Sequence, residues 1–394
     1  MSFVKTLAEN IRYHRIRLGL SQKELAGHMQ VSVQAVSKWE RGLSLPELCA
    51  VYDLSRLFGV TVDALMSVAE GGENASAFIG VDGGGGKTEF VLFSSVGAVL
   101  SRTVLSATNP HTVGLERTCS VLREGIDALL PLAKNGVRGI YLGIAGIPKG
   151  DLRKQLDRFL SSTYPDIPFA IGGDVETVFA SCVGVERGIV ATVGTSSMVA
   201  ARTENGTRGF GGGGYLLEEG GSGFDLGREA LRAALQEQQG YGEKTVLTDL
   251  INAHLGAHFM SHFMELYAGA PRSIASLAPL VFSAMRVGDA VATKIVEKSF
   301  SALADRIVLA RDMTDAGDIL IFSGGLLRVS ELWMPILLSR LPYKPTVILP
   351  RLPQIFGACR LALSAFGGGA VLPEGRYLEE YERLKRSQSV FGRS

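Results

Sequence analysis

The sequence predicts an all-α domain at the N-terminus, followed by a larger α/β domain built from two similar halves. Short capped helical segments fill about the first seventy residues. Apolar strands then alternate with amphipathic helices, which is the pattern of a sheet covered by helices. A strand, glycine turn and strand near residue 80 recur about 110 residues later, which indicates a duplicated fold.

The composition agrees with a multidomain α/β protein. The 394 residues are 46% hydrophobic and 20% charged, and a chain of this length suggests two or three domains. The net charge of +1 excludes a whole-chain polyelectrolyte, so any nucleic-acid contact must come from a local basic surface.

The cysteines and the apolar runs predict a cytoplasmic protein. Cys49, Cys119, Cys182 and Cys359 are isolated, with neither disulfide-rich nor metal-ligand spacing, as expected in a reducing compartment. The chain contains no run of 18 apolar residues, and it begins with a charged amphipathic segment. We therefore expect neither a membrane span nor a signal peptide.

The first part of the chain reads as a string of short helices. Ser21 and Ser32 each precede a helical segment as N-caps, and Glu24 completes a capping box with Ser21. The expected helices are Phe3–Leu18, Ser21–Met29, Ser32–Arg41, Pro46–Phe58 and Thr61–Met66.

The segment 19–42 resembles the helix-turn-helix domain of the Cro/repressor type. Residues 1–41 hold seven basic and three acidic side chains, a net charge of +4, so positive charge gathers where DNA would bind. The resemblance implies contacts to a double-stranded operator by Gln22, Ser32, Gln34, Ser37 and Lys38. One such unit reads a half-site, so a homodimer is expected. The alternative is a helical protein-interaction module.

The larger domain opens with a glycine-rich hairpin at residues 78–93. Four consecutive glycines, Gly83–Gly86, remove side chains where a backbone would approach phosphates closely. Asp82, just before them, is placed to meet the metal of a magnesium nucleotide. A Walker A loop would require glycine in place of Val81 and a helix after Thr88, so that loop is excluded. The alternative is an ordinary hairpin turn.

The following segments continue the alternation of strands and helices. Gly188–Ala200 repeats the hairpin pattern, and Asp318–Leu327 is an apolar strand that runs into two glycines. These features suggest phosphates bound in a cleft between two lobes.

These segments together resemble the sugar-kinase, hsp70 and actin superfamily, in particular the N-acetylglucosamine kinase/BadF-type ATPase family, over about residues 78–367. The resemblance implies a duplicated two-lobe, ribonuclease-H-like (actin-like ATPase) fold. We expect the following bounds: helix-turn-helix domain 1–67, linker 68–76, N-terminal lobe 77–187, C-terminal lobe 188–370 and a polar, mobile tail 371–394.

The same resemblance implies a set of site residues. ATP with Mg²⁺ would be bound by Asp82, Gly83, Gly84, Gly85, Gly86, Lys87, Thr88, Gly194, Thr195, Ser196, Gly324 and Gly325, with the metal at Asp82. An amino sugar would be bound by Asn109, Gly146, Glu219 and Asp225. Asp174 corresponds to the general base.

The sugar-binding segment departs from the family pattern. Gly213 replaces the usual Trp, Glu219-Gly220 replaces the usual Asp-Glu pair, and Ser196 replaces a usual Gly. The phosphate-binding segments match better, so phosphotransfer is the firmer expectation and the sugar the weaker one.

Asp174 has a chemical argument of its own. It ends a strand and enters a helix, where ligands collect in α/β sheets, and a carboxylate there can accept the proton of an attacking hydroxyl. The alternative is a helix N-cap.

The sequence thus predicts an ATP-dependent kinase of an N-acetylglucosamine-like sugar, fused to a DNA-binding domain that couples sugar status to transcription. The first alternative is a regulator that senses sugar or nucleotide with weak turnover. The second is an ATPase that activates a dehydratase, which would require cysteines around an iron–sulfur cluster. The isolated cysteines disfavour it.

Overall fold

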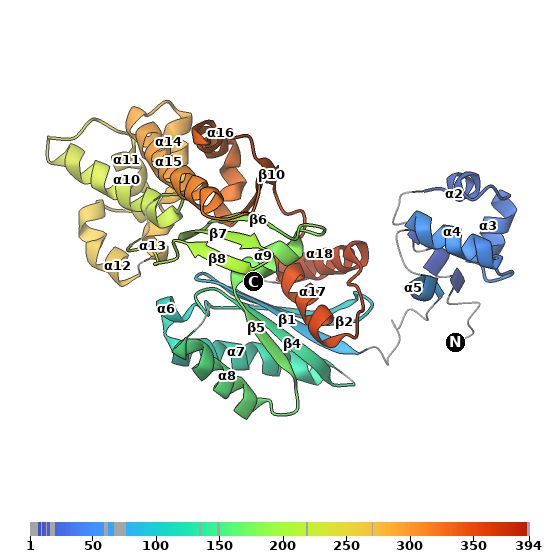
Figure 1. Cartoon of the computed structure of the whole chain (residues 1–394). Helices are drawn as coiled ribbons and strands as arrows, with labels where there is room; N and C mark the ends of the chain where they lie inside the picture. Colours follow the sequence, from blue (N-terminus) through green and yellow to red (C-terminus); the bar gives the residue numbers. More distant parts are fainter. Residues whose placement is uncertain are drawn as a thin grey trace.

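A computed structural model describes residues 7–8, 10–12, 14–15, 20–58, 62–66, 76–133, 135–147, 150–217, 220–269 and 271–391. A helical N-terminal domain precedes a body made of two five-stranded sheets with helices packed on them (Figure 1). No helix among these residues is long and apolar enough to cross a membrane.

The N-terminal domain contains the predicted short helices. They are α2 (Gln22–His28), α3 (Val33–Glu40), α4 (Leu48–Phe58) and α5 (Val62–Met66). The capping box forms, because Ser21 Oγ accepts from Glu24 N–H while Glu24 Oε2 accepts from Ser21 N–H at 2.7 Å. Most of the predicted helix Phe3–Leu18 lies outside the described residues, but Leu7 and Ile11 are helical and buried. They pack with residues of the other helices, such as Trp39 and Phe58.

The first sheet has the strand order β3-β2-β1-β4-β5. Its strands are β1 (Ala77–Gly83), β2 (Thr88–Ser94), β3 (Val99–Leu105), β4 (Val137–Ile144) and β5 (Phe169–Gly172). β1, β2 and β3 pair antiparallel, whereas β1, β4 and β5 pair parallel. The two glycine-flanking strands therefore form the predicted hairpin.

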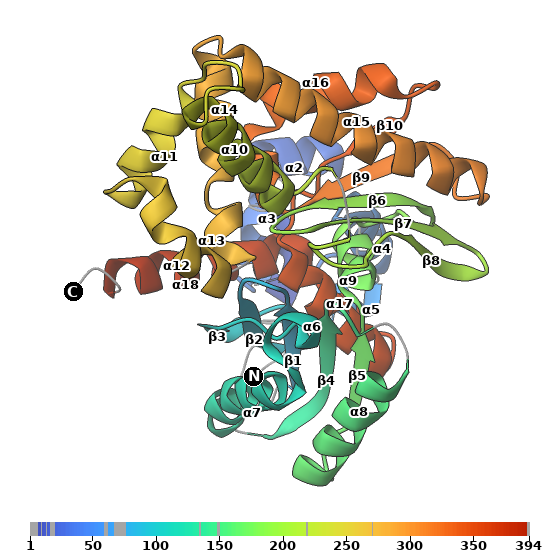
Figure 2. The ribbon, with the colours of Figure 1, turned by 90° about the vertical axis from the view of Figure 1, so that its left-hand side faces the viewer.

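Helices cover both faces of the first sheet (Figures 1 and 2). The segments between its strands are α6 (Pro110–Val113), α7 (Leu115–Leu129), the 3-10 helix η1 (Leu130–Leu132) and α8 (Asp151–Thr163). Apolar side chains of α7 and α8 pack on one face. The other face is covered from the far end of the chain by α17 (Gln354–Phe366) and α18 (Glu374–Phe391).

The second sheet repeats the plan with the order β10-β9-β6-β7-β8. Its strands are β6 (Gly188–Val193), β7 (Ser197–Thr203), β8 (Gly206–Phe210), β9 (Ile319–Ser323) and β10 (Thr346–Ile348). The helical segments of this lobe are α10 (Gly223–Gln238), α11 (Leu247–Leu255), η2 (Phe259–His262), α12 (Phe263–Ala268), α13 (Arg272–Ala275), α14 (Ala278–Arg286), α15 (Ala290–Asp312), η3 (Gly325–Val329) and α16 (Ser330–Arg340).

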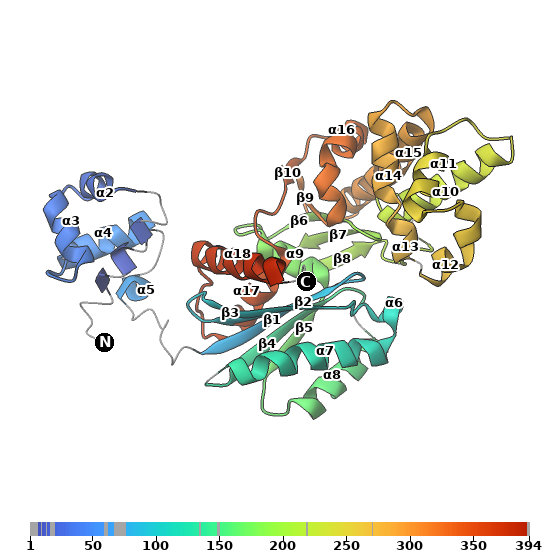
Figure 3. The ribbon, with the colours of Figure 1, turned by 180° about the vertical axis from the view of Figure 1, so that it is seen from behind.

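One further helix, α9 (Asp174–Ser181), joins the two halves. Its Val178 and Phe179 pack against Val190 and Ile321 of the second sheet, and Gln354 of α17 donates to Thr177 Oγ1 at 3.0 Å. The duplicated two-lobe fold that the sequence predicts is therefore confirmed, with α9 and α17 between the lobes (Figure 3).

The prediction of a mobile polar tail is wrong. Residues 374–391 form helix α18, and its Tyr377 and Tyr381 are buried against the first sheet. These tyrosines recur at helical spacing, so one face of an otherwise charged helix is apolar. Together with α17, this helix returns the end of the chain to the first lobe.

Candidate functional site

The turn of the first hairpin is open on its outer side. Gly84 N–H donates to Lys87 O at 3.1 Å, and Gly84 O accepts from the amides of Thr108 and Asn109. A Cβ atom built on Gly85 or Gly86 would meet no protein atom within 4 Å, and neither residue has the positive φ that favours glycine. The protein itself therefore does not require glycine at these two positions. Close approach of a ligand to the backbone would account for them.

Two predicted carboxylates lie at the same edge of the first sheet. The strand register aligns Asp82 with Gly143 and Gly143 with Gly172, so β1, β4 and β5 end together. Asp174 begins α9 two residues after β5. Ligands collect at this carboxyl edge in α/β sheets.

The electrostatics of this edge are unusual. Burial, with the negative charges of Glu89 and Asp174, raises the pKa of Asp82 to about 7. Burial also raises the pKa of Asp174, opposed by hydrogen bonds from backbone amides at the start of α9. Neighbouring carboxylates that repel one another are stabilised by a bound cation, so the edge fits a magnesium nucleotide. Among the described residues, no cluster of three His, Cys, Asp or Glu side chains could hold a metal without such a ligand.

The structure places the N-cap of α9 at Gly173 rather than at Asp174. Glu176 Oε2 accepts from Gly173 N–H at 3.0 Å and satisfies the helix start. Asp174 is therefore the first residue of the helix, and its carboxylate accepts from backbone amides of the first turn.

Asn109 and Gly146, both predicted to bind the sugar, lie beside each other next to the first hairpin. A Cβ on Gly146, which has φ +80°, would lie 2.6 Å from Asn109 Oδ1. Asn109 also caps α6, because its Oδ1 accepts from His111 N–H at 3.0 Å. Glycine is required at 146 both by the backbone conformation and by this close approach.

Thr88 is turned away from the open turn. Its side chain is fully buried, and its hydroxyl donates to Ser106 O at 2.8 Å and lies 2.9 Å from Thr108 Oγ1. Thr88 therefore stabilises the loop from beneath, and its hydroxyl does not lie on the surface of the turn. Lys87 is exposed on the turn, with Nζ 3.4 Å from Glu89 Oε2.

The second hairpin is tied to the start of α10. Gly194 N–H donates to Ser196 O at 3.1 Å across the turn, while Gly194 O and Thr195 O accept from the amides of Gly223 and Phe224. This second turn is therefore hydrogen-bonded to the start of α10, the helix that contains Asp225, a residue predicted to bind the sugar.

Asp225, predicted to bind the sugar, is buried among protein donors. Its carboxylate accepts from Ser299 Oγ at 2.7 Å, from Arg228 Nη2 at 2.7 Å and from Gly220 N–H at 3.2 Å. The geometry uses Asp225 to hold the loop before α10. Glu219 lies outside the described residues.

Gly324 lies at the end of β9 against the second hairpin. A Cβ there would lie 2.4 Å from Val193 O, and φ is +110°, so both conformation and packing require glycine. Gly325 has open space around it. A small cavity of about 150 Å³ adjoins this turn, lined by Val178, Ser181, Ser323, Gly324, Leu327, Pro350, Leu352 and Gln354. Gly324 and Gly325 are among the residues that the sequence predicts for ATP binding.

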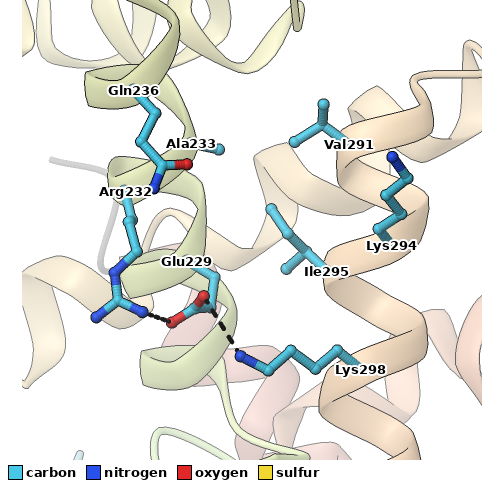
Figure 4. A pocket seen from close by; sticks show the side chains of 8 residues that line it. All are labelled: Glu229, Arg232, Ala233, Gln236, Val291, Lys294, Ile295 and Lys298. Atoms are coloured by element: carbon cyan, nitrogen blue, oxygen red, sulfur yellow. Dashed lines mark hydrogen bonds and ion pairs between the residues drawn. The ribbon is translucent and has the colours of Figure 1, made fainter. Parts of the chain in front are cut away.

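A second cavity, of about 170 Å³, lies between α10 and α15 and holds none of the predicted site residues (Figure 4). Its charges are paired: Glu229 contacts Arg232 at 2.9 Å and Lys298 at 3.9 Å, and Lys294 contacts Glu243 at 2.6 Å. It is not the candidate site.

In the N-terminal domain, the predicted DNA-contacting residues of α3 face outward. Gln34 and Lys38 are exposed, Ser37 is half-buried and Ser32 caps the helix by accepting from Ala35 N–H at 3.1 Å. Gln22 Nε2 donates to Glu40 Oε2 at 2.8 Å.

Arg15, which the charge count assigns to the DNA-facing surface, is turned inward. Its guanidinium pairs with Glu40 at 2.5 Å and donates to Leu20 O at 2.7 Å. This arginine therefore serves the packing of the domain.

Sequence reasoning missed Glu89. It is 5% exposed and lies directly opposite Asp82 in the hairpin. A single carboxylate between Thr88 and Phe90, at the start of an otherwise buried strand, is the signal that could have identified it.

Comparison with known proteins agrees with this geometry. Residues 79–359 match the BadF/BadG/BcrA/BcrD ATPase family and residues 11–65 match a helix-turn-helix family. An N-acetyl-D-glucosamine kinase of Dictyostelium discoideum is 28% identical over 58% of this chain and 77% of its own length. An N-acetylmuramic acid/N-acetylglucosamine kinase of Clostridium acetobutylicum is 27% identical over 63% of this chain and 85% of its own.

A crystal structure from Chromobacterium violaceum, provisionally named as an N-acetylglucosamine kinase, superposes with a TM-score of 0.58 at 25% identity. The match covers 72% of this chain and 98% of that one. The family match spans most of the chain, and the hairpins, the lobes and the α9 junction agree with it. The chain belongs to the BadF/BadG/BcrA/BcrD ATPase family and carries a helix-turn-helix domain ahead of it.

Proposed function

We propose that this chain transfers the γ-phosphate of ATP to a hydroxyl of an amino sugar of the N-acetylglucosamine type. The observation that carries the proposal is the first hairpin, where a turn open at Gly85 and Gly86 adjoins the carboxylates of Asp82 and Asp174. The kinase names of the two sequence relatives support the choice of sugar.

The predicted residues other than Thr88, which is buried beneath the loop, have a task in this reaction. The backbone of Gly83–Gly86 and Gly194–Ser196 would hold the phosphates with Lys87, and Gly324 and Gly325 would lie against the adenosine. Asp82 is the residue that would hold Mg²⁺, which neutralises phosphate charge when bound with the nucleotide. Asn109, Gly146, Glu219 and Asp225 remain our assignments for the sugar side, with Asp225 acting through the loop that it holds.

Asp174 would act as the general base. The sugar oxygen forms a bond to the γ-phosphorus, the bond from that phosphorus to the β–γ bridging oxygen breaks, and Asp174 takes the hydroxyl proton. The products are a sugar phosphate and ADP.

We propose further that the N-terminal domain binds an operator as part of a cytoplasmic homodimer and couples sugar status to transcription. The outward position of Gln34 and Lys38 on α3 supports base contacts in the major groove.

Mass spectrometry of the products from a panel of amino sugars with ATP and Mg²⁺ tests the kinase proposal. We expect a mass increase of one phosphoryl group on N-acetylglucosamine or a close relative. No product from any sugar, together with sugar-dependent DNA binding, would replace the kinase with a sensor.

The DNA proposal is tested with Gln34→Ala on a selected operator and on random DNA. We expect a loss of roughly 1–3 kcal/mol on the operator alone, because one bidentate base contact is removed. Equal losses on both DNAs would remove Gln34 from base reading. Gln30, exposed in the turn between α2 and α3, provides the control variant Gln30→Gly, which should leave discrimination unchanged.

A further inference from the structure

Glu89 is a buried carboxylate held by two separate elements of the first lobe. Its Oε1 accepts from Arg102 Nε of β3 at 2.6 Å and from the Tyr381 hydroxyl of α18 at 2.7 Å. The Arg102 guanidinium also lies 5.4 Å from the centre of the Tyr381 ring. A buried carboxylate with a cationic partner and a hydroxyl donor is fixed in place.

Glu89 touches the open turn with its other oxygen. Oε2 lies 3.4 Å from Lys87 Nζ, and the hairpin register places Glu89 directly opposite Asp82. The Lys87 side chain is 65% exposed, whereas that of Glu89 is 6% exposed. An exposed lysine thus lies at ion-pair distance from a buried carboxylate beside the turn.

The helix that completes this arrangement lies outside the family match. The match ends at residue 359, whereas α18 begins at Glu374. Its buried Tyr377 lies with its hydroxyl 3.4 Å from Cys359 Sγ of α17, and it packs against Phe93 and Phe356. These contacts fix α18 on the sheet, so that Tyr381 reaches Glu89.

We propose that Glu89 is a positioning residue of the nucleotide site, and that α18 acts on that site through Tyr381, Glu89 and Lys87. The proposal rests on the proposed function, because it assumes that Lys87 meets the phosphates. If Lys87 is already held at the turn before the nucleotide binds, less side-chain entropy is lost on binding. The C-terminal helix is then part of the nucleotide-binding apparatus.

A matched pair of tyrosines on α18 tests this. Tyr381→Phe and Tyr377→Phe each remove one hydroxyl from a buried ring of the same helix, but only Tyr381 contacts Glu89. The affinity of the full chain for the Mg²⁺ complex of a non-hydrolysable ATP analogue would be measured by calorimetric titration, with thermal unfolding in parallel.

We expect Tyr381→Phe to weaken nucleotide binding roughly three- to tenfold, the usual net worth of one hydrogen bond, and Tyr377→Phe to leave it unchanged. In a Lys87→Ala background, Tyr381→Phe should not lower the nucleotide affinity further, because Tyr381 acts on the nucleotide only through Glu89 and Lys87. If Tyr381→Phe proves unstable, Arg102→Lys replaces it as the test. This change weakens the other hydrogen bond to Glu89 Oε1 and should lower the nucleotide affinity to a similar extent.

The outcomes separate the two proposals. Wild-type protein that binds no nucleotide would overturn the proposed function. Wild-type binding with equal affinities for the two tyrosine variants, or a full Tyr381→Phe effect without Lys87, would overturn the role of α18 alone.

Discussion

The two glycine hairpins have the same sequence pattern but different surroundings. The turn of the first, Gly84–Lys87, has open space at Gly85 and Gly86 and lies beside carboxylates. The turn of the second, Gly194–Ser196, is bonded to the start of α10 through the amides of Gly223 and Phe224. Ser197, directly after it, donates to Gly220 O at 2.6 Å and accepts from Arg306 Nη2 at 2.8 Å.

This difference indicates a division of labour within a duplicated fold. The first hairpin has unfilled space beside its backbone, whereas the second connects through Ser197 to the loop at Gly220–Asp225. Antiparallel pairing of the two hairpin strands recurs in both halves. The turn of the second hairpin, Gly194–Ser196, contains no acidic residue, whereas Asp82 directly precedes the first turn.

The largest effect is expected from Asp174→Asn, which tests the acidic character of the sheet edge beside the first hairpin. The amide keeps the shape but cannot take the hydroxyl proton, so turnover should fall by roughly 10²–10⁴. Glu176 bonds Gly173 N–H, so stability should change little. Product formation by quantitative mass spectrometry and denaturant unfolding would measure the two quantities. A variant with wild-type turnover would show that Asp174 is not the base.

Gly220→Ala tests the close packing of the loop that Ser197 of the second hairpin contacts. Its Cβ would lie 2.3 Å from Ser299 O at φ +82°, so we expect a loss of roughly 2–4 kcal/mol from overpacking and backbone strain. Gly86→Ala is the matched control and should change the free energy of unfolding by less than about 0.5 kcal/mol. Similar losses for both variants in urea unfolding would remove the contrast between the hairpins.

A smaller effect is expected from pH on the free energy of unfolding, through the carboxylate of Asp82. The pKa of Asp82 is raised from 3.8 to about 7, so the folded state binds more protons than the unfolded state between these values. The contribution of Asp82 to stability is therefore full at low pH and is lost as pH rises towards 7. The free energy of unfolding of Asp82→Asn, compared with that of wild type, should therefore increase from pH 5 to about pH 8. A difference between the two proteins in the free energy of unfolding, measured in urea, that stays constant over these pH values would contradict the charge repulsion at Asp82.

Much of the fold follows from local sequence signals. Ser21 and Ser32 start α2 and α3 where their caps predict, and the glycines place both hairpin turns. The site was harder to predict. Nothing local indicates that Tyr381 meets Glu89, because 292 positions separate them and charged residues surround the tyrosine on α18. The inward turn of Arg15 likewise depends on Glu40, a partner 25 positions away.

The central claim is that the first hairpin holds the phosphates of a nucleotide, and Gly86→Val tests it most directly. A Cβ atom there meets no protein atom within 4 Å, and the backbone does not have the positive φ that favours glycine, so thermal unfolding should stay close to that of wild type. Its side chain would occupy the space that we assign to the phosphates. Titration with the Mg²⁺ complex of a non-hydrolysable ATP analogue should therefore show affinity lowered roughly ten- to hundredfold. Wild-type affinity in a folded Gly86→Val protein would contradict the claim.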